Sequence, residues 1–198
     1  MTYETRGQLT QEFVRRASDM GLTVDVPMDG AFNAEIAIIA EAPGEREKAA
    51  RIPLVGGSGQ HLWNVLRKYG ITRNQVYVTN VIKRQVSLST HTDERVPVAP
   101  NELSLWEGLL QWELAQLPNL KYVVLLGNFA LSAVTGESGI MAWRGSVMPV
   151  SIGTVGNRRT VVAICAVNPE ACRRNRAESD DPTSKWHAGS FVIGGPQR

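Results

Sequence analysis

Four short runs of apolar, mostly β-branched residues alternate with helical patterns along the chain, and this alternation restricts its fold more than any other feature. Each run is bounded by turn or polar residues, which is typical of strands buried on both faces of a parallel sheet. Strands that alternate with helices predict an α/β fold of three layers, an α/β/α sandwich around a central, mainly parallel four-stranded sheet. The predicted strands are residues 36–40, 76–79, 122–126 and 160–167.

Helical patterns lie between and before these strands. The predicted helices are residues 8–20, 58–69, 102–117 and 128–135, with Ser58 as a candidate cap of the second. Residues 145–151 are expected to form an extra strand, antiparallel to 160–167. The segment 85–100 is long, polar and without periodicity, so it is expected to be a loop that shapes a binding site.

The composition is that of a soluble globular protein, with 43% hydrophobic and 20% charged residues among 198. This length suits a single domain over residues 1–198, and the tail after about residue 176 is expected to be partly disordered. The polar N-terminus lacks the order of a secretion signal, and no apolar run approaches the roughly 20 residues that cross a bilayer. We therefore expect a cytoplasmic protein with no membrane contact, and a monomer by default.

The two cysteines exclude a disulfide framework and a four-cysteine zinc or iron–sulfur site built by one chain. No metal cluster or other cofactor is therefore expected. The net charge of +2 does not by itself indicate a nucleic-acid binder, but binding needs only a local basic patch. Such a patch is present on both sides of the fourth predicted strand, where the arginines are Arg158, Arg159, Arg173, Arg174 and Arg176.

Polar side chains follow the predicted strands at their carboxyl ends, which is where ligands bind in sheets of this kind. Glu41 follows the first strand and Asn80 the second. The third ends in Gly127 and Asn128, and the fourth is followed by Asn168. Because these ends meet at one edge of a parallel sheet, the pattern predicts a site there.

These residues lie in motifs that resemble those of the uracil-DNA glycosylase superfamily. The string EAPGEREKAARIPLVGGSGQHL resembles the signature GEAPGxxExxxGxPFVGxAGxLL of its family 4 branch. The strings VYVTNVIKR, YVVLLGNFAL and AVNPEA resemble, in order, its second-strand signature, its third strand and its HPS-type loop. The resemblance covers about residues 33–175 and implies a glycosylase-like fold with DNA as the partner.

The implied reaction is that of a monofunctional DNA glycosylase, which flips a pyrimidine nucleotide and hydrolyses its N-glycosidic bond to leave an abasic site. The resemblance assigns Glu41 and Glu47 to the attacking water and the sugar cation. Asn168 stands in place of the histidine that holds charge on the leaving base. Without the motif, Glu47 would be interpreted as a solvated loop acid.

The same resemblance implies a base pocket and a DNA-binding surface. Ala42, Pro43 and Gly44 shape a turn whose amides face the base, Asn80 reads the pyrimidine edge, and Leu54 occupies the position of an aromatic that stacks on uracil. The alternatives are a strand-end cap for the asparagine and a solvated basic surface for the cations. The residues expected to contact phosphates are Lys83, Arg84, Arg173, Arg174 and Arg176.

Departures from the signature bear on the substrate. Arg51 replaces a glycine, Leu54 the stacking aromatic and Asn168 the histidine. They favour a modified pyrimidine, including a bulky phage-type base, and with it a role in anti-phage defence. Two alternatives stay open: an ordinary uracil-DNA repair glycosylase, and a non-catalytic DNA-binding or base-sensing module. Cys165 and Cys172 cannot supply the four-cysteine cluster of the family 4 branch, and Cys165 is expected in the core.

Overall fold

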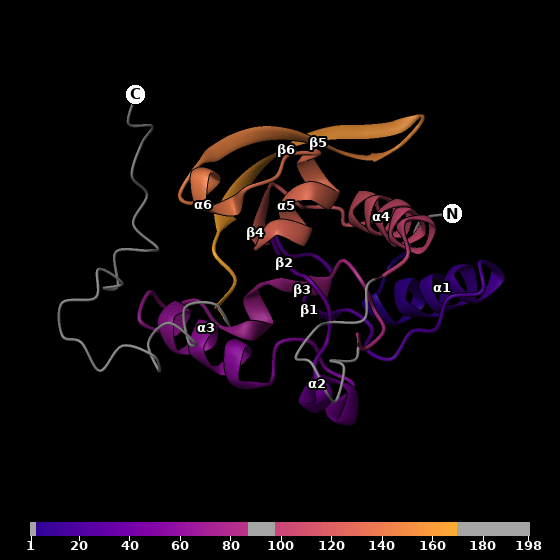
Figure 1. Ribbon diagram of the computed structural model, residues 1–198, viewed down its shortest axis with the longest axis horizontal. Helices are drawn as coiled ribbons and strands as arrows, with labels where there is room; N and C mark the ends of the chain where they lie inside the picture. Colours follow the sequence, from indigo (N-terminus) through magenta and orange to yellow (C-terminus); the bar gives the residue numbers. More distant parts are fainter. Residues whose placement is uncertain (1–2, 87–97, 170–198) are drawn as a thin grey trace.

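The computed structural model describes residues 3–86 and 98–169, in which six strands form one mixed sheet (Figure 1). The strand order is β1-β3-β2-β4-β6-β5. The four predicted strands are confirmed as the parallel centre of the sheet, and an antiparallel strand at each edge extends it to six. The inner strands are β3 (Tyr77–Asn80), β2 (Ile36–Ala40), β4 (Tyr122–Leu126) and β6 (Asn157–Ala166), and the edges are β1 (Asp29–Gly30) and β5 (Val147–Thr154).

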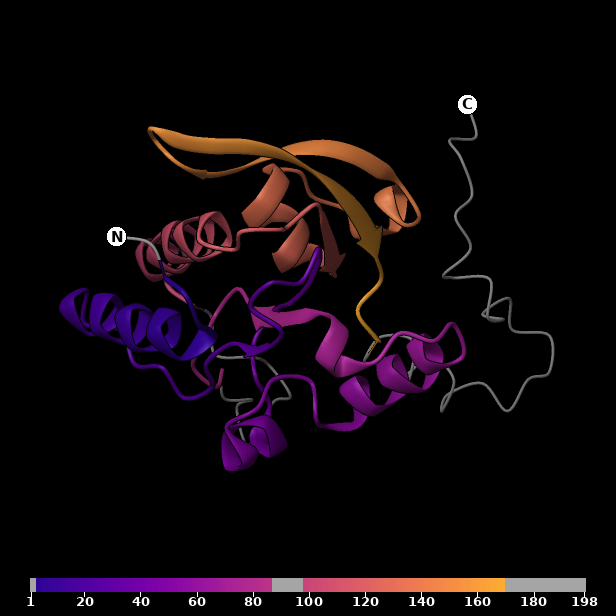
Figure 2. The ribbon, with the colours of Figure 1, turned by 180° about the vertical axis from the view of Figure 1, so that it is seen from behind.

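Helices cover both faces of the sheet, which confirms the three predicted layers (Figures 1 and 2). Alternate residues of β2 show how the faces divide. Ala37 and Ile39 belong to a larger core beneath α1 (Arg6–Asp19), α4 (Pro100–Ala115) and α5 (Asn128–Thr135). Ile38 and Ala40 belong to a smaller core beneath α3 (Gly57–Arg67). Successive side chains of β2 therefore pack on opposite faces of the sheet.

Three short helices are absent from the sequence prediction, because their lengths give no periodic signal. They are α2 (Glu45–Ala50), the 3₁₀ helix η1 (Arg73–Gln75) and α6 (Ile140–Trp143). The expectation that Ser58 caps the second predicted helix is wrong: α3 has Gly56 as its N-cap, with no side-chain hydrogen bond at the cap. Ser58 lies within the first turn of that helix.

The apolar stripe of the third predicted helix is confirmed, because Trp106, Leu110 and Leu114 of α4 are fully buried. Glu113 lies on the same buried face. Cys165 of β6 is buried in the larger core, as expected. None of the described helices is long and apolar enough to cross a membrane. The tail after residue 176 and the centre of the predicted 85–100 loop lie outside the described residues.

Candidate functional site

The carboxyl ends of β2 and β3 place Glu41 beside Asn80. Ala40 pairs with Asn80 in the sheet. Beyond that pair the two chains stay hydrogen-bonded, with the amide of Val81 donating to the carbonyl of Ala40 (2.8 Å) and that of Ile82 to the carbonyl of Glu41 (3.0 Å). The backbone that carries the two side chains is therefore fixed from both strands.

The ends of β4 and β6 bring Asn168 to the same edge. The amide of Gly127 donates to the carbonyl of Ala166 (2.9 Å), two residues before Asn168. Gly127 has φ +88°, and a Cβ there would lie 3.2 Å from the Cβ of Asn168. Glycine therefore permits both the conformation and the close approach. Asn128 is used structurally, since its side chain accepts a hydrogen bond from the amide of Ile140 (2.7 Å).

The side chain of Asn80 contains an unsatisfied hydrogen-bond donor. Its side chain is 2% exposed, and its Nδ2 has no hydrogen-bond partner among residues 3–86 and 98–169. A buried polar group without a partner costs about 1–3 kcal/mol, and such a group in a native structure calls for an explanation. A ligand that presents an acceptor would supply one.

Glu47 holds the turn that follows α2. Its Oε1 accepts hydrogen bonds from the amides of Val55 (3.0 Å) and Gly56 (2.6 Å). A Cβ at residue 56 would lie only 2.8 Å from that oxygen, so the carboxylate rests against the glycine. The sequence reasoning missed this contact. Gly44 begins α2 as its N-cap, and Pro43 before it is buried, so this turn leads directly from the end of β2 into the helix that presents Glu47.

Leu54 adopts a left-handed conformation, with φ +54°, which is unusual for a residue with a side chain. Its side chain is 7% exposed and packs in the smaller core with Ala40, Leu62 and Ala166. Residues 53–56, which we name the Leu54 turn, are mostly buried, and the backbone is strained at Leu54. Such strain persists only when the surroundings impose it, and it is frequent at ligand-binding sites.

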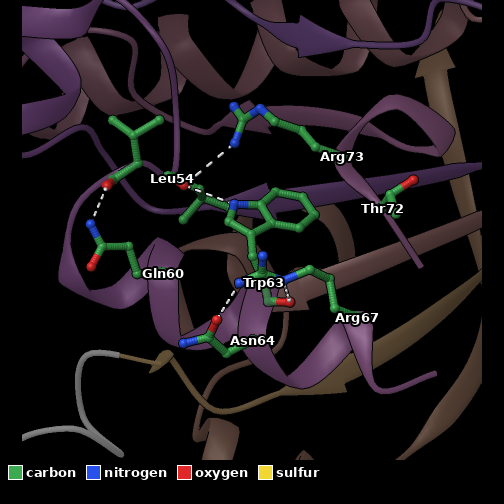
Figure 3. Close-up of a pocket in the computed structure, with 8 residues that line it drawn as sticks. Leu54, Gln60, Trp63, Asn64, Arg67, Thr72 and Arg73 are labelled. Atoms are coloured by element: carbon green, nitrogen blue, oxygen red, sulfur yellow. Dashed lines mark hydrogen bonds between the residues drawn. The ribbon is translucent and has the colours of Figure 1, made fainter. Parts of the chain in front are cut away.

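Two side chains bind the carbonyl oxygens of the Leu54 turn (Figure 3). Trp63 Nε1 donates to the carbonyl of Leu54 at 2.9 Å, and Arg73 Nη1 reaches the same oxygen at 3.4 Å. Arg73 also donates to the carbonyl of Pro53, and its Nε binds Asp29 Oδ2 at 2.7 Å. The turn is therefore fixed through its amides by a carboxylate and through its carbonyls by a guanidinium and an indole.

A pocket of about 540 Å³ lies beside this turn. The Arg73 guanidinium lies 5.1 Å from the centroid of the Trp63 ring. The pocket adjoins the site but does not include Glu41, Asn80 or Asn168. Its lining residues are Leu54, Val55, Gln60, Trp63, Asn64, Arg67, Thr72 and Arg73.

The expected phosphate contact of Lys83 is wrong. The side chain is 0% exposed and forms an ion pair with Glu113, which is also 0% exposed, with 2.7 Å between Nζ and Oε2. Burial lowers the pKa of Lys83, and the facing carboxylate opposes that shift. Such a cation cannot reach DNA.

Arg84 is partly exposed and forms two hydrogen bonds with the carboxylate of Glu102, at 2.5 and 2.7 Å. Its hydrogen bonds lower the pKa of Glu102. Arg173, Arg174 and Arg176 lie outside the described residues. Among the residues that are described, no group of three or more His, Cys, Asp or Glu side chains is placed to hold a metal ion.

The family model of the uracil DNA glycosylase superfamily matches residues 27–189. The chain belongs to this superfamily. It is 36% identical over 106 residues to a type-4 uracil-DNA glycosylase of Archaeoglobus fulgidus, which covers 53% of this chain and 49% of that protein. It is 32% identical over 104 residues to one of Thermotoga maritima, which covers 52% of this chain and 50% of the relative.

A type-4 uracil-DNA glycosylase of Pyrobaculum aerophilum is 41% identical over 58 residues, which is 29% of this chain and 30% of the relative. This superfamily member thus spans at most about half the length of these relatives.

Proposed function

We propose that this superfamily member is a DNA glycosylase that flips a pyrimidine nucleotide out of DNA and hydrolyses its N-glycosidic bond. The observation that carries the proposal is the buried, unpartnered Nδ2 of Asn80 beside Glu41. A pyrimidine presents carbonyl oxygens along its edge, and one of them would accept the hydrogen bond that Asn80 Nδ2 lacks.

The proposed reaction breaks the bond between C1′ of the sugar and the ring nitrogen of the base. The base leaves with the bonding electron pair, and the sugar becomes an oxocarbenium cation. Glu41 orients a water, accepts its proton as the oxygen bonds to C1′, and stabilises the cation. Asn80 and Asn168 donate hydrogen bonds to the base as it gains negative charge.

In the same proposal Glu47 helps Glu41 to orient the water and to stabilise the sugar cation. One of its oxygens, Oε1, is already hydrogen-bonded to the Leu54 turn. In the turn of Ala42, Pro43 and Gly44, the backbone N–H groups of Ala42 and Gly44 lie near the leaving base, and Pro43, which has no N–H, shapes the turn. On the DNA-binding side, Arg84 and the arginines Arg173, Arg174 and Arg176 contact phosphates.

The proposed substrate is a modified pyrimidine, with removal of phage-type bases as the biological role. Support comes from Leu54, whose buried aliphatic side chain replaces a stacking ring, and from Asn168, a neutral donor in place of a histidine. The second candidate is uracil in DNA, which the names of the related proteins favour. The non-catalytic DNA-binding or base-sensing module remains the third.

The test is a glycosylase assay on duplex and single-stranded oligonucleotides that carry one uracil, one hypermodified pyrimidine or only ordinary bases. Abasic sites are detected by alkaline strand cleavage. Glu41→Gln and Asn80→Ala should each lower the single-turnover rate by about 10²–10³-fold, because each removes a group that stabilises the transition state. Glu45→Gln is the matched control, since Glu45 is an exposed acid of α2.

Release of uracil with no action on modified bases would overturn the substrate proposal and leave the glycosylase. No product from any DNA, with binding retained, would overturn the glycosylase and favour the binding module.

A further inference from the structure

The ammonium of Lys83 is surrounded by oxygens inside the protein. Thr79 Oγ1 lies 2.7 Å from Nζ, the carbonyl oxygen of Asn80 2.5 Å and Glu113 Oε2 2.7 Å. Thr79 and Asn80 accept hydrogen bonds from this ammonium, whereas the contact with Glu113 Oε2 is an ion pair without hydrogen-bond geometry. The ring of Phe13 lies 4.8 Å from Nζ and covers the cation from α1.

The carboxylate of Glu113 is held as well. Tyr77 on β3 donates its hydroxyl to Glu113 Oε1 at 2.9 Å. We refer to Tyr77, Thr79, Lys83 and Glu113 as the Lys83 network; it joins α4 to β3 and to the segment after it.

Stability alone is a weak reason for such a network. Removing two charges from water costs several kcal/mol per ion, and replacing a buried pair by apolar side chains of similar volume is frequently neutral or stabilising. A buried network can instead select one arrangement of the chain, because every other arrangement leaves a charge without a partner.

The arrangement that this network selects is that of the candidate site. The ammonium of Lys83 donates a hydrogen bond to the carbonyl oxygen of Asn80, three residues earlier. This bond fixes the segment that follows β3. Within that segment the amide of Ile82 binds the carbonyl of Glu41 at 3.0 Å. The carbonyl of Lys83 accepts hydrogen bonds from the amides of Asp25 and Val26, both at 3.0 Å.

The side chain of Asn80 itself is directed away from the network. Tyr77 belongs to the larger core and Val78 to the smaller one, so residues alternate between the two faces of β3. Asn80 shares the face of Val78. The network therefore binds the backbone of Asn80 from the opposite face of the sheet. The side-chain amide of Asn80 remains available to a ligand.

We propose that the Lys83–Glu113 ion pair is a positioning device, which fixes the backbone at Asn80 and Glu41 so that the amide and the carboxylate stand at the correct distance for a flipped base. Its catalytic consequence rests on the proposed glycosylase function. Its structural consequence, a rigid segment from residue 80 to 83, does not.

The decisive variant is the double substitution Lys83→Met/Glu113→Leu, which removes both charges and leaves neither without its partner. Its unfolding free energy should fall, because the Tyr77 hydroxyl and the Asn80 carbonyl lose their partners, so the rate is measured where the variant is fully folded. Under those conditions its single-turnover rate should fall by about 10–100-fold, as expected when a reacting group is displaced by about 1 Å. Tyr77→Phe is the control, because it removes a hydrogen bond of Glu113 and leaves the contact with Asn80 in place.

The same double substitution is then made with Asn80→Ala. If the ion pair acts partly through Asn80, it should lower the rate less in that background than in the wild type, because only the position of Glu41 is then left to disturb. An equal loss of rate with and without Asn80 would overturn the proposal, as would an unchanged rate in the double variant.

A second measurement is independent of catalysis. Amide hydrogen exchange of Val81 and Ile82 should accelerate at least about 10-fold in Lys83→Met/Glu113→Leu relative to Leu131→Ala, a variant destabilised in α5 and compared at equal unfolding free energy. Unchanged exchange would overturn the positioning role. If the wild type cleaves no DNA, the proposed function fails, and this measurement still decides whether the ion pair holds the segment.

Discussion

Replacing Gly59 by alanine tests whether α3 and the Leu54 turn are fixed against each other. A Cβ at residue 59 would lie 2.0 Å from the carbonyl oxygen of Leu54 and 2.2 Å from its carbonyl carbon. Real Cβ atoms do not approach closer than 3.0 Å, so the helix or the turn must move by at least about 1.0 Å. Both contacts are with backbone, and no side chain can rotate out of the way.

The cost follows from what that movement disturbs. Overpacking of this kind costs about 1–3 kcal/mol. A shift of the turn also weakens the hydrogen bonds from Val55 and Gly56 to Glu47, each of which is worth about 1.5–3 kcal/mol when the acceptor is charged. Alanine has a higher helix propensity than glycine, which offsets up to about 1 kcal/mol of the lost unfolding free energy. The expected net loss is about 2–4 kcal/mol, or a decrease in Tm of about 4–16 °C.

Urea unfolding at constant pH, followed by circular dichroism and tryptophan fluorescence, measures this loss. Gly108→Ala is the matched control, because Gly108 lies within α4 and a methyl group added there would have nothing within 4 Å. The control should gain up to about 1 kcal/mol. A Gly59→Ala protein within about 0.5 kcal/mol of the wild type would refute the close contact between α3 and the turn.

Three further substitutions test local strain and charge. Arg51→Gly should stabilise the protein by up to about 1 kcal/mol in thermal unfolding, because Arg51 ends α2 with φ +56°; a lower Tm would contradict this. Burial, aided by the Glu113 carboxylate, raises the pKa of Tyr77 well above 10.0, so the native phenol keeps a proton that the unfolded state loses. Above pH 10 the wild type should therefore lose about 1.4 kcal/mol per pH unit more than Tyr77→Phe, and parallel pH curves would refute the assignment. Arg84→Gln should cost less than about 1 kcal/mol at pH 7, and urea unfolding should show this difference vanishing as the pH falls through the lowered pKa of Glu102.

The sequence predicts the centre of the fold because that information is local. Residues 36–40 and 122–126 are continuous apolar runs, and each forms a strand with those limits. Strand β1 has only two residues, Asp29 and Gly30, and exists through its pairing with Val78 and Tyr77. Such a strand has no periodicity to detect, and only its partner defines it.

The same distinction explains the site residues. The places of Glu41, Asn80 and Asn168 at one edge of the sheet could be predicted because each lies at the end of a strand that is visible in the sequence. Their part in catalysis stays a proposal. The prediction for Lys83 is wrong because this lysine precedes an arginine and looks like a surface cation, whereas its partner Glu113 lies far along the chain. The available signal was the place of Glu113 on the apolar stripe of α4, where a charge requires a buried partner.

The residues that hold the Leu54 turn differ from those that we propose to face a substrate. Glu47 and Gly59 hold the Leu54 turn, and both match the family 4 signature that the sequence resembles. Leu54 and Asn168 differ from the residues that the resemblance places there, and both belong to the base site that we propose. A frame fixed through backbone amides and carbonyls does not depend on the side chains that it presents. It can therefore keep its geometry while those side chains change, as the proposed change of pyrimidine substrate requires.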